Sequence, residues 1–355
     1  MFYNNMNFVK YLLTPFQILY SLIVRARNLL YDFNIISIYS PKTLVISIGN
    51  LKVGGTGKTP MVEYLIKIFK NYKTAILSRG YKRKTKGFVL ADNKKNQAHH
   101  IGDENCQLYN KFHNITIGCS ENRVNGIKQL LQIDDKIQIV ILDDGYQHRS
   151  LKRDIDILLT EYSQLFTSDS LLPIGKLREP KFEKRRANII IITKCPNNIS
   201  KTIQKSIHEA LNLDLHQKIY FSYISKHVFV NMKTNKDHNI NKDLKHLLVT
   251  GIENPQELKN FLDTKNIDFK HLKFYDHHNF IQEDINNMIQ LRKTRDYAKE
   301  LLLTEKDFYR LSKRHKAELE KYFTLICIQI EIDFIDQDKS NFNHQLCNFV
   351  KSKTT

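Results

Sequence analysis

The sequence lacks the spacings by which cysteine and histidine usually hold a metal ion. Its five cysteines are scattered and odd in number, and no two of them form a Cys-x-x-Cys pair. The adjacent His277 and His278 have no further Cys or His at ligand spacing, which favours a polar loop over a metal site. Scattered cysteines of this kind are typical of a protein kept in the reducing cytosol.

The sequence also lacks an apolar run long enough to cross a membrane comfortably. Residues 11–24 are fourteen uncharged residues, which as a helix span about 21 Å, whereas a bilayer core needs about 30 Å. The start is not basic and no small-residue cleavage site follows, which argues against a cleaved signal peptide. Residues 1–40 are instead predicted to form an amphipathic helix, which either lies in a membrane interface or docks on the protein's own core. Its apolar face would comprise Phe8, Tyr11, Leu12, Phe16, Leu19, Tyr20, Ile23 and Leu30.

No recognisable basic helix, zinc site or aromatic RNA-binding motif accompanies the net charge of +18. Such a charge indicates an acidic partner, which could be a nucleic acid, an anionic membrane or a phosphorylated substrate. Lysine is spread along the whole chain, so the charge alone decides little. Without a supporting motif, nucleic acid is the least favoured of the three partners.

A strand, a glycine-rich turn and a helix follow one another in residues 44–69. The turn Gly54-Gly55-Thr56-Gly57 can direct backbone N–H groups toward an anion at the start of the helix. Lys58 is expected to reach the β- and γ-phosphates of a nucleotide, and the Thr59 hydroxyl to bind Mg²⁺. Pro60 suits the first helical turn, where its missing N–H costs nothing. This order of elements predicts a phosphate-binding loop.

The match to the pattern G-x-x-x-x-G-K-[ST] is incomplete, because Lys52 stands where the pattern has glycine. One alternative is a glycine-rich turn that joins a strand to a helix without binding phosphate. Another is the deviant loop of nucleotide-switch ATPases, in which a lysine directly precedes the Gly-Gly pair. Here Val53 intervenes, which counts against that alternative.

Two further acidic segments fit a phosphotransfer site. Residues 138–142 are predicted to form a buried strand that delivers Asp143 and Asp144 to its carboxyl end, opposite the loop, where Mg²⁺ is usually held. Adjacent carboxylates such as Asp103 and Glu104 usually lie on the surface. They are candidates here because a phosphotransfer site needs a base or a metal ligand from outside the loop. No Asn-Lys-x-Asp motif for guanine follows the strand that ends at residue 193, which favours ATP over GTP.

A basic segment follows the apolar run at residues 74–78, and its first cation is Arg79. Side chains just past a strand's carboxyl end lie where α/β sheets bind ligands. A solvated charge run is an equally good interpretation of residues 82–86.

The apolar runs predict an α/β fold of the P-loop NTPase type, with a mostly parallel sheet flanked by helices. At 355 residues the chain is long enough for two domains. The expected division is an N-terminal membrane-associating helix, a kinase domain, linker strands and a smaller α/β domain. The corresponding ranges are 1–40, 41–218, 219–245 and 246–355.

Taken together, the motifs resemble those of the tetraacyldisaccharide 4′-kinase family, the lipid A kinases of Gram-negative bacteria. The likeness extends from about residue 8 to 310, and this family's loop does not require glycine at position 52. The matching segments are Gly49-Asn50, Gly54 to Pro60, Ser78-Arg79-Gly80-Tyr81, Gly102-Asp103-Glu104, Leu142 to His148, Leu172 to Pro180, Asp276-His277-His278 and Thr304-Glu305-Lys306-Asp307. Asn105 and Lys176 stand where the family often has proline.

The resemblance implies ATP-dependent phosphorylation of the 4′-hydroxyl of an acylated glucosamine disaccharide 1-phosphate, giving lipid IVA. It implies Asp103 as general base partnered by His277, with Lys58 assisting phosphoryl transfer. Nucleotide binding would fall to residues 54–59. Mg²⁺ would be bound by Thr59, Glu104, Asp143 and Asp144. Substrate binding would fall to Arg79, Arg123, Gln147, His148, Arg178 and Glu179.

A lipid substrate also implies where such a protein works. The resemblance predicts peripheral or monotopic attachment to the cytoplasmic face of the Gram-negative inner membrane, through the N-terminal helix. It thereby favours the interfacial interpretation of residues 1–40 over docking on the core. An anionic substrate in an anionic leaflet would account for the basic net charge.

Overall fold

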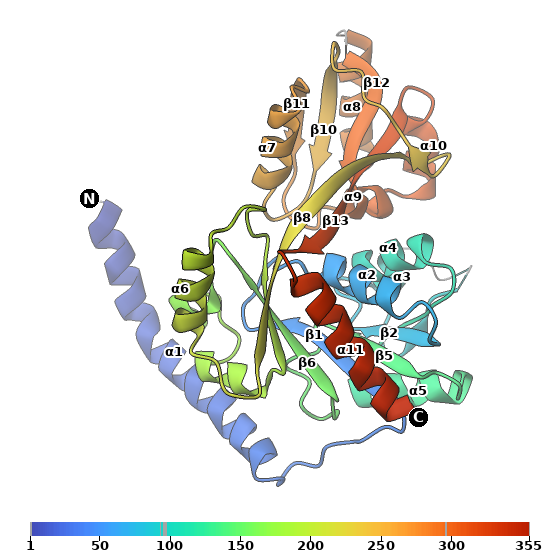
Figure 1. Ribbon diagram of the computed structural model, residues 1–355. Coiled ribbons are helices and arrows are strands. Elements are labelled where there is room, and N and C mark those ends of the chain that lie inside the picture. The colour runs from blue at the N-terminus through green and yellow to red at the C-terminus, as the bar shows by residue number, and fades with distance from the viewer. Residues whose placement is uncertain (1, 93, 95–97, 295–296, 355) are drawn as a thin grey trace.

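The computed structural model describes residues 2–92, 94, 98–294 and 297–354, and it describes side chains from residue 12 onward, except those of residues 294 and 354. Among these residues, one continuous sheet runs through two lobes in the order β11-β10-β12-β13-β8-β7-β6-β1-β5-β2-β4-β3, with β9 paired to β8. Figure 1 shows the lobes one above the other, joined by β8 and β13. The predicted α/β fold with a mostly parallel sheet is confirmed.

The first lobe carries six parallel strands and a short antiparallel edge strand among the described residues. They are β1 (Leu44–Asn50), β2 (Thr74–Ser78), β3 (Val89–Leu90), β4 (Thr116–Cys119), β5 (Ile139–Asp143), β6 (Ile155–Glu161) and β7 (Ile189–Thr193). Its helices are α2 (Lys58–Ile68), α3 (Ala98–Ile101), α4 (Asp103–Lys111), α5 (Arg123–Ile133) and α6 (Lys201–Leu211), with short 3₁₀ turns η1 (Phe166–Ser168) and η2 (Lys181–Arg186).

Alternate residues of each central strand pack against helices on opposite faces of the sheet. In β1, Ile46 and Ile48 face α2, whereas Val45 joins the core beneath α5. Strands buried on both faces are nearly all apolar, which explains why the runs Ile139–Asp143 and Ile189–Thr193 are so hydrophobic.

The second lobe has its own core on a smaller sheet. Its strands are β10 (Lys245–Thr250), β11 (Phe269–Lys273), β12 (Tyr297–Thr304) and β13 (Thr324–Phe334), all parallel to their neighbours within the lobe. Its helices are α7 (Gln256–Thr264), α8 (Gln282–Thr294), α9 (Glu305–Arg310) and α10 (Lys313–Leu319).

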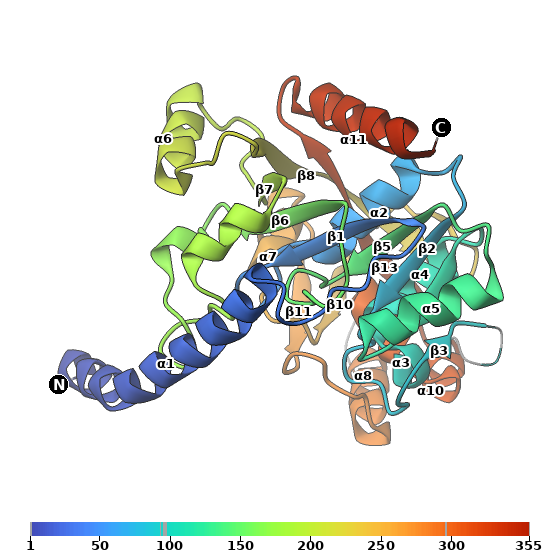
Figure 2. The same cartoon turned by 90° about the horizontal axis from the view of Figure 1, so that it is seen from below.

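The connection between the lobes differs from the expected hairpin or linker. β8 (Lys218–Asn231) is one long strand, parallel to β7 at its start and antiparallel to β13 beyond it, with the short β9 (Lys236–Asp237) alongside. The C-terminal helix α11 (Asp338–Thr354) then returns to the first lobe, where Phe342, Leu346 and Val350 join the core formed by β1 and α2. Figure 2 shows α11 and α5 on opposite faces of this lobe. The range 246–355 therefore does not form one spatial unit, because the apolar face of α11 is buried against the first lobe.

The N-terminal helix α1 (Phe2–Asp32) lies along the outside of the first lobe, and its N-terminal end projects beyond it (Figures 1 and 2). Its exposed apolar side chains are Leu12, Phe16, Ile18, Leu19, Leu22, Ile23, Leu29 and Leu30. Tyr20 is half-buried on the protein side, where its hydroxyl donates to the backbone oxygen of Arg178. The side chains of Phe8 and Tyr11 lie outside the described residues. No helix in the described part of the chain is long and apolar enough to span a membrane.

Candidate active site

The predicted phosphate loop connects β1 to α2. Gly57, at the start of α2, has a left-handed backbone (φ 84°), a conformation that favours glycine. The buried Asn50 donates its amide to the Thr56 hydroxyl at 2.9 Å, and Thr193 at the end of β7 donates its hydroxyl to the Thr56 carbonyl at 3.0 Å. The loop is therefore held by the ends of β1 and β7, and its N–H groups lie at a helix N-terminus, where an anion is stabilised.

Asp144 lies beside the loop and contacts two cations. Lys58 Nζ is 3.6 Å from Asp144 Oδ1, and Arg178 Nη1 is 2.9 Å from Asp144 Oδ2. Burial alone would raise the pKa of Asp144, but the charges of Lys58 and Arg178 lower it to about 2. Asp144 is therefore an anion at neutral pH.

Asp143 is the last residue of β5 and has a different environment. Burial, reinforced by the negative charge of Glu104, raises the pKa of Asp143 to about 6. Its Oδ1 atom is buried and has no hydrogen-bond partner among the described residues. A buried carboxylate oxygen without a partner fits a site for a cation, which would satisfy the oxygen and favour the charged form.

Asp103 brings the two lobes together at the first turn of α4. Its Oδ2 atom is 2.8 Å from Nδ1 of His277, which belongs to the second lobe. Arg310, at the end of α9, donates from Nε to the same oxygen at 2.6 Å and places Nη2 3.1 Å from His277 Nδ1. The Tyr81 ring lies edge-on to His277 with centroids 5.0 Å apart. Two residues 174 positions apart thus meet, as the resemblance implied.

Glu104 is also held from the second lobe. Lys306 Nζ is 2.8 Å from Glu104 Oε1. Burial raises the pKa of Glu104, but the charge and hydrogen bond of Lys306 outweigh it and bring the pKa to about 2. Lys306 and Arg310 were not predicted as site residues, although Lys306 belongs to a segment that carried the resemblance. Their partners lie about 200 residues away, so no local spacing could reveal the contacts.

Arg123 and His148 lie deeper than substrate-binding residues usually do. The guanidinium of Arg123 is buried and donates to the backbone oxygens of Ser120 at 2.5 Å and Asp143 at 3.5 Å. Burial lowers its pKa to about 10. Burial, with the nearby charge of Arg123, lowers the pKa of His148 to about 3, so this imidazole is neutral at physiological pH. Arg79 is exposed.

Gln147 and Glu179 link the loop to the segment after η1. The Gln147 amide donates to the backbone oxygen of Asn50 at 2.9 Å and to Glu179 Oε2 at 3.3 Å. The Glu179 side chain is only 1% exposed. Such burial favours a role in holding neighbouring groups over direct contact with a substrate.

Glu253 is a further acid that the sequence did not single out. It follows β10 in the second lobe, and its Oε2 atom accepts a hydrogen bond from the backbone N–H of Gly55 at 2.9 Å. Its Oε1 atom is 3.5 Å from Lys176 Nζ. In this structure a carboxylate therefore occupies a donor of the phosphate loop.

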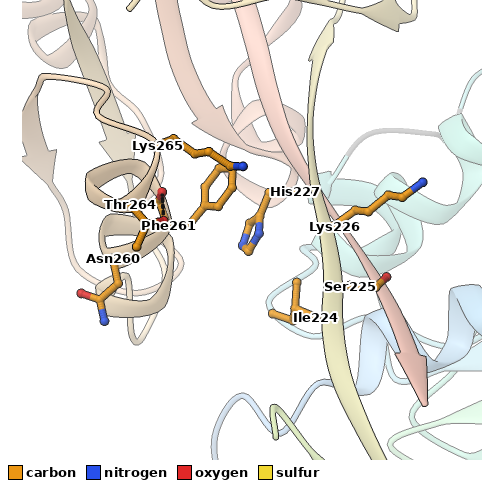
Figure 3. A pocket seen from close by; sticks show the side chains of 8 residues that line it. All are labelled: Ile224, Ser225, Lys226, His227, Asn260, Phe261, Thr264 and Lys265. Carbon is orange, nitrogen blue, oxygen red and sulfur yellow. Dashed lines mark hydrogen bonds between the residues drawn. The ribbon is translucent and has the colours of Figure 1, made fainter. Parts of the chain in front are cut away.

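One hollow lies away from these residues. A cavity of about 490 Å³ opens between β8 and α7, where His227 stacks on Phe261 with ring centroids 3.9 Å apart (Figure 3). Burial lowers the pKa of His227 to about 4. Beside the loop there is a cavity of only about 20 Å³, lined by Gly57, Pro60 and residues of β7, β8 and β13.

His99, His100 and His278 each have a close partner. His99 and His100 pack on each other, and His278 contacts Asp284 at 2.7 Å. Among the described residues, no three His, Cys, Asp or Glu side chains converge as a ready set of metal ligands. A metal at this site would thus depend on other oxygen donors besides the carboxylates.

Comparisons with known proteins agree on one family. The family model described as tetraacyldisaccharide-1-P 4′-kinase matches residues 9–351. The tetraacyldisaccharide 4′-kinase of Flavobacterium psychrophilum is 41% identical over 355 residues, which is 99% of each chain. The protein of the same name from Bacteroides thetaiotaomicron is 40% identical, over 96% of this chain and 93% of its own. Among solved structures, LpxK from Aquifex aeolicus in complex with ATP is 26% identical, with a TM-score of 0.74 over 96% of this chain and 99% of that one.

Proposed function

Because this chain belongs to the tetraacyldisaccharide-1-P 4′-kinase family, we propose how its residues divide the work of that kinase. The enzyme phosphorylates the 4′-hydroxyl of a tetraacyl glucosamine disaccharide 1-phosphate with ATP, a step of lipid A biosynthesis that gives lipid IVA. The observation that carries the proposal is the contact of Asp103 with His277 across the lobes, in the same site as the phosphate loop.

Residues 54–59 bind the nucleotide. Their N–H groups and Lys58 neutralise the phosphates, and Lys58 does so from the position where it now contacts Asp144. Little covalent chemistry is left to the protein in phosphoryl transfer, so positioning and charge carry most of the rate.

Magnesium fits the oxygen donors present. Mg²⁺ is usually bound by one or two carboxylates together with waters and substrate phosphates. Thr59, Asp143, Asp144 and Glu104 would supply the protein's share, and the orphaned Oδ1 of Asp143 supports this assignment. When bound, the ion would neutralise charge developing on the transferred phosphoryl group.

Asp103 accepts the proton of the 4′-hydroxyl, and His277 orients the Asp103 carboxylate. A sugar hydroxyl is a poor nucleophile near neutral pH, so a positioned carboxylate is useful. His277 and Arg310 both contact Oδ2 of Asp103, which fixes the plane of the carboxylate. Arg79, Arg178, Gln147 and His148 bind the substrate's head group. Glu179 holds Gln147 in place, and Arg123 holds the backbone of Asp143.

The N-terminal helix α1 attaches the enzyme to the cytoplasmic face of the inner membrane. Its exposed apolar side chains support this assignment, since a patch of this kind on a helix marks a lipid or protein contact. High salt should release part of the protein and detergent all of it. A variant starting at Pro41 that still sediments with membranes would contradict the role of α1.

The deciding experiment supplies labelled ATP and a tetraacyl disaccharide 1-phosphate in detergent micelles. Label in the lipid fraction is expected. The alternative, a nucleotide-switch ATPase, predicts ATP-dependent dimerisation and label only in free phosphate.

A further inference from the structure

Glu179 is the centre of a buried polar cluster that joins four segments of the chain. Its Oε1 atom accepts hydrogen bonds from Arg27 Nη2 at 2.9 Å and Asn28 Nδ2 at 3.2 Å, both on α1. Its Oε2 atom accepts from Arg186 Nη2 at 2.5 Å and Gln147 Nε2 at 3.3 Å. Because all four side chains donate to one buried carboxylate, their positions are interdependent.

The cluster leads directly to the active site. Arg178, the residue before Glu179, pairs with Asp144 at 2.9 Å, and its backbone N–H donates to the carbonyl of Leu51 at 2.7 Å. The Gln147 amide holds both Glu179 and the Asn50 carbonyl at the start of the loop. Movement of Glu179 would therefore displace Arg178 and Gln147 together.

The cluster also leads outward to α1. The Tyr20 hydroxyl donates to the Arg178 carbonyl at 2.8 Å. Arg149 donates to the Asn28 carbonyl at 2.9 Å and to Asp32 at 2.6 Å. The inner edge of α1 is thus attached to the site by polar contacts, while apolar side chains cover its outer edge. A helix attached in this way can do more than anchor the protein.

We propose that Arg27 and Asn28 are positioning residues of the kinase, which act through Glu179 to hold Arg178 and Gln147 in their working geometry. The helix that we assign to the lipid surface then helps set the site that receives the lipid head group. The inference rests on the proposed function, because it concerns the same reaction and the same substrate.

A matched pair of variants separates this role from membrane attachment. Arg25→Ala and Arg27→Ala each remove one positive charge from the same turn of α1. Both side chains are exposed, but Arg27 contacts Glu179, whereas Arg25 lies over the Phe182 ring at 5.4 Å. Sedimentation with vesicles of phosphatidylcholine and phosphatidylglycerol should weaken equally in both variants. In micelles, kcat should fall about 10- to 100-fold for Arg27→Ala, because misplaced groups cost rate, and stay within about 2-fold for Arg25→Ala.

Three further variants guard against simple misfolding. Asn28→Leu leaves the charge of the helix unchanged, so vesicle binding should persist while kcat falls. Tyr20→Phe removes only the hydroxyl on Arg178 and should lower kcat about 3-fold, in line with the loss of one hydrogen bond. Arg27→Lys keeps the positive charge but not the planar guanidinium with its several donors, so its kcat should lie between those of Arg27→Ala and wild type. The KM for ATP should stay near wild type in each, since the loop keeps its contacts with β7.

The outcomes distinguish the two claims. If wild type yields no labelled lipid, the proposed function fails. If wild type is active and Arg27→Ala matches Arg25→Ala in kcat, with Asn28→Leu also unimpaired, the positioning role is refuted and the function stands. A fall in kcat that tracks vesicle binding across all variants would likewise refute it.

Discussion

Asp143 and Asp144 are surrounded by residues of their own lobe, whereas Asp103 and Glu104 are held by residues of the other lobe. Asp144 contacts Lys58 and Arg178, both of the first lobe. These contacts require only that the first lobe is folded. The part of the site formed by Lys58, Asp143 and Asp144 is therefore complete within the first lobe.

The other carboxylate pair depends on how the lobes meet. Asp103 is contacted by His277 and Arg310, and Glu104 by Lys306. All three partners belong to the second lobe. A base assembled in this way is complete only when the lobes are together, which would exclude water during transfer. The comparison predicts that changes at Lys58, Asp143 and Asp144 impair ATP handling, whereas changes at Asp103 impair turnover alone. Glu104 belongs to both parts, because it is a proposed metal ligand and is held by Lys306.

Lys58→Ala should have the largest effect. It removes the cation that neutralises the phosphates, so turnover should fall about 10³-fold or more. Asp143→Asn should do the same by removing a metal ligand. Both variants should keep the wild-type melting temperature, measured by differential scanning calorimetry. Turnover near that of wild type would remove the substituted residue from the mechanism.

Asp103→Ala and His277→Ala test the part assembled between lobes. General-base catalysis contributes about 10²- to 10⁴-fold, so each should lower kcat within that range while the ATP dissociation constant stays unchanged. The double variant should cost little beyond the worse single one, because the two act as a unit. Fully additive losses would show that the residues have separate roles.

Arg310 should matter less than the groups it touches. Its side chain is 2% exposed and bonds Asp103, Asp307 and the Gly251 carbonyl. Arg310→Gln should lower kcat about 10- to 30-fold through loss of alignment. Arg310→Lys retains the charge but not the planar guanidinium that bonds several oxygens at once, so an intermediate kcat is expected. If the two variants are equally impaired, the charge of Arg310 has no part in the alignment.

Local patterns in the sequence indicated the carboxylates of both groups, whereas the contact of Asp103 with His277 of the other lobe was implied only by the resemblance. The phosphate loop and Asp143 each lie within a local strand–turn pattern, so neighbouring residues were sufficient to find them. Arg310 and Glu253 act through partners about 200 residues away, and no spacing encodes such a contact. The range 219–245, expected as linker strands, contains most of β8, a single strand that changes partner from β7 to β13 along its length. A change of partner within one strand leaves no local pattern in the sequence.

Glu305 lets the lobe contact be tested by stability. It lies between Lys111 at 3.3 Å and Gln107 at 3.1 Å, which come from the first lobe. Burial, with the nearby charge of Glu63, raises the pKa of Glu305 to about 7. The folded protein then binds more protons than the unfolded chain between about pH 4.5 and 7, so its stability should fall as pH rises through that window.

Glu305→Gln should flatten this dependence. At 1.36 kcal/mol per pKa unit, the free energy of unfolding should lose roughly 2 kcal/mol of its change between pH 5 and 8. Urea titrations at the two pH values measure this. An unchanged pH dependence in the variant would assign the effect to other groups.

Glu253 is expected to give the smallest effect. It is an acid of the second lobe whose side chain contacts the phosphate loop itself. Its carboxylate accepts from the Gly55 N–H at 2.9 Å, and a phosphate oxygen would need that donor. The carboxylate would also repel the phosphates once ATP arrives. Glu253→Gln should therefore bind ATP about 3-fold more tightly, a change near that of one exposed hydrogen bond. Calorimetric titration of ATP measures the affinity, with Glu283→Gln, an exposed acid on α8, as the control for net charge. Equal affinities in both variants would show that Glu253 does not compete with nucleotide, and weaker binding in Glu253→Gln would show instead that it helps to hold the loop ready.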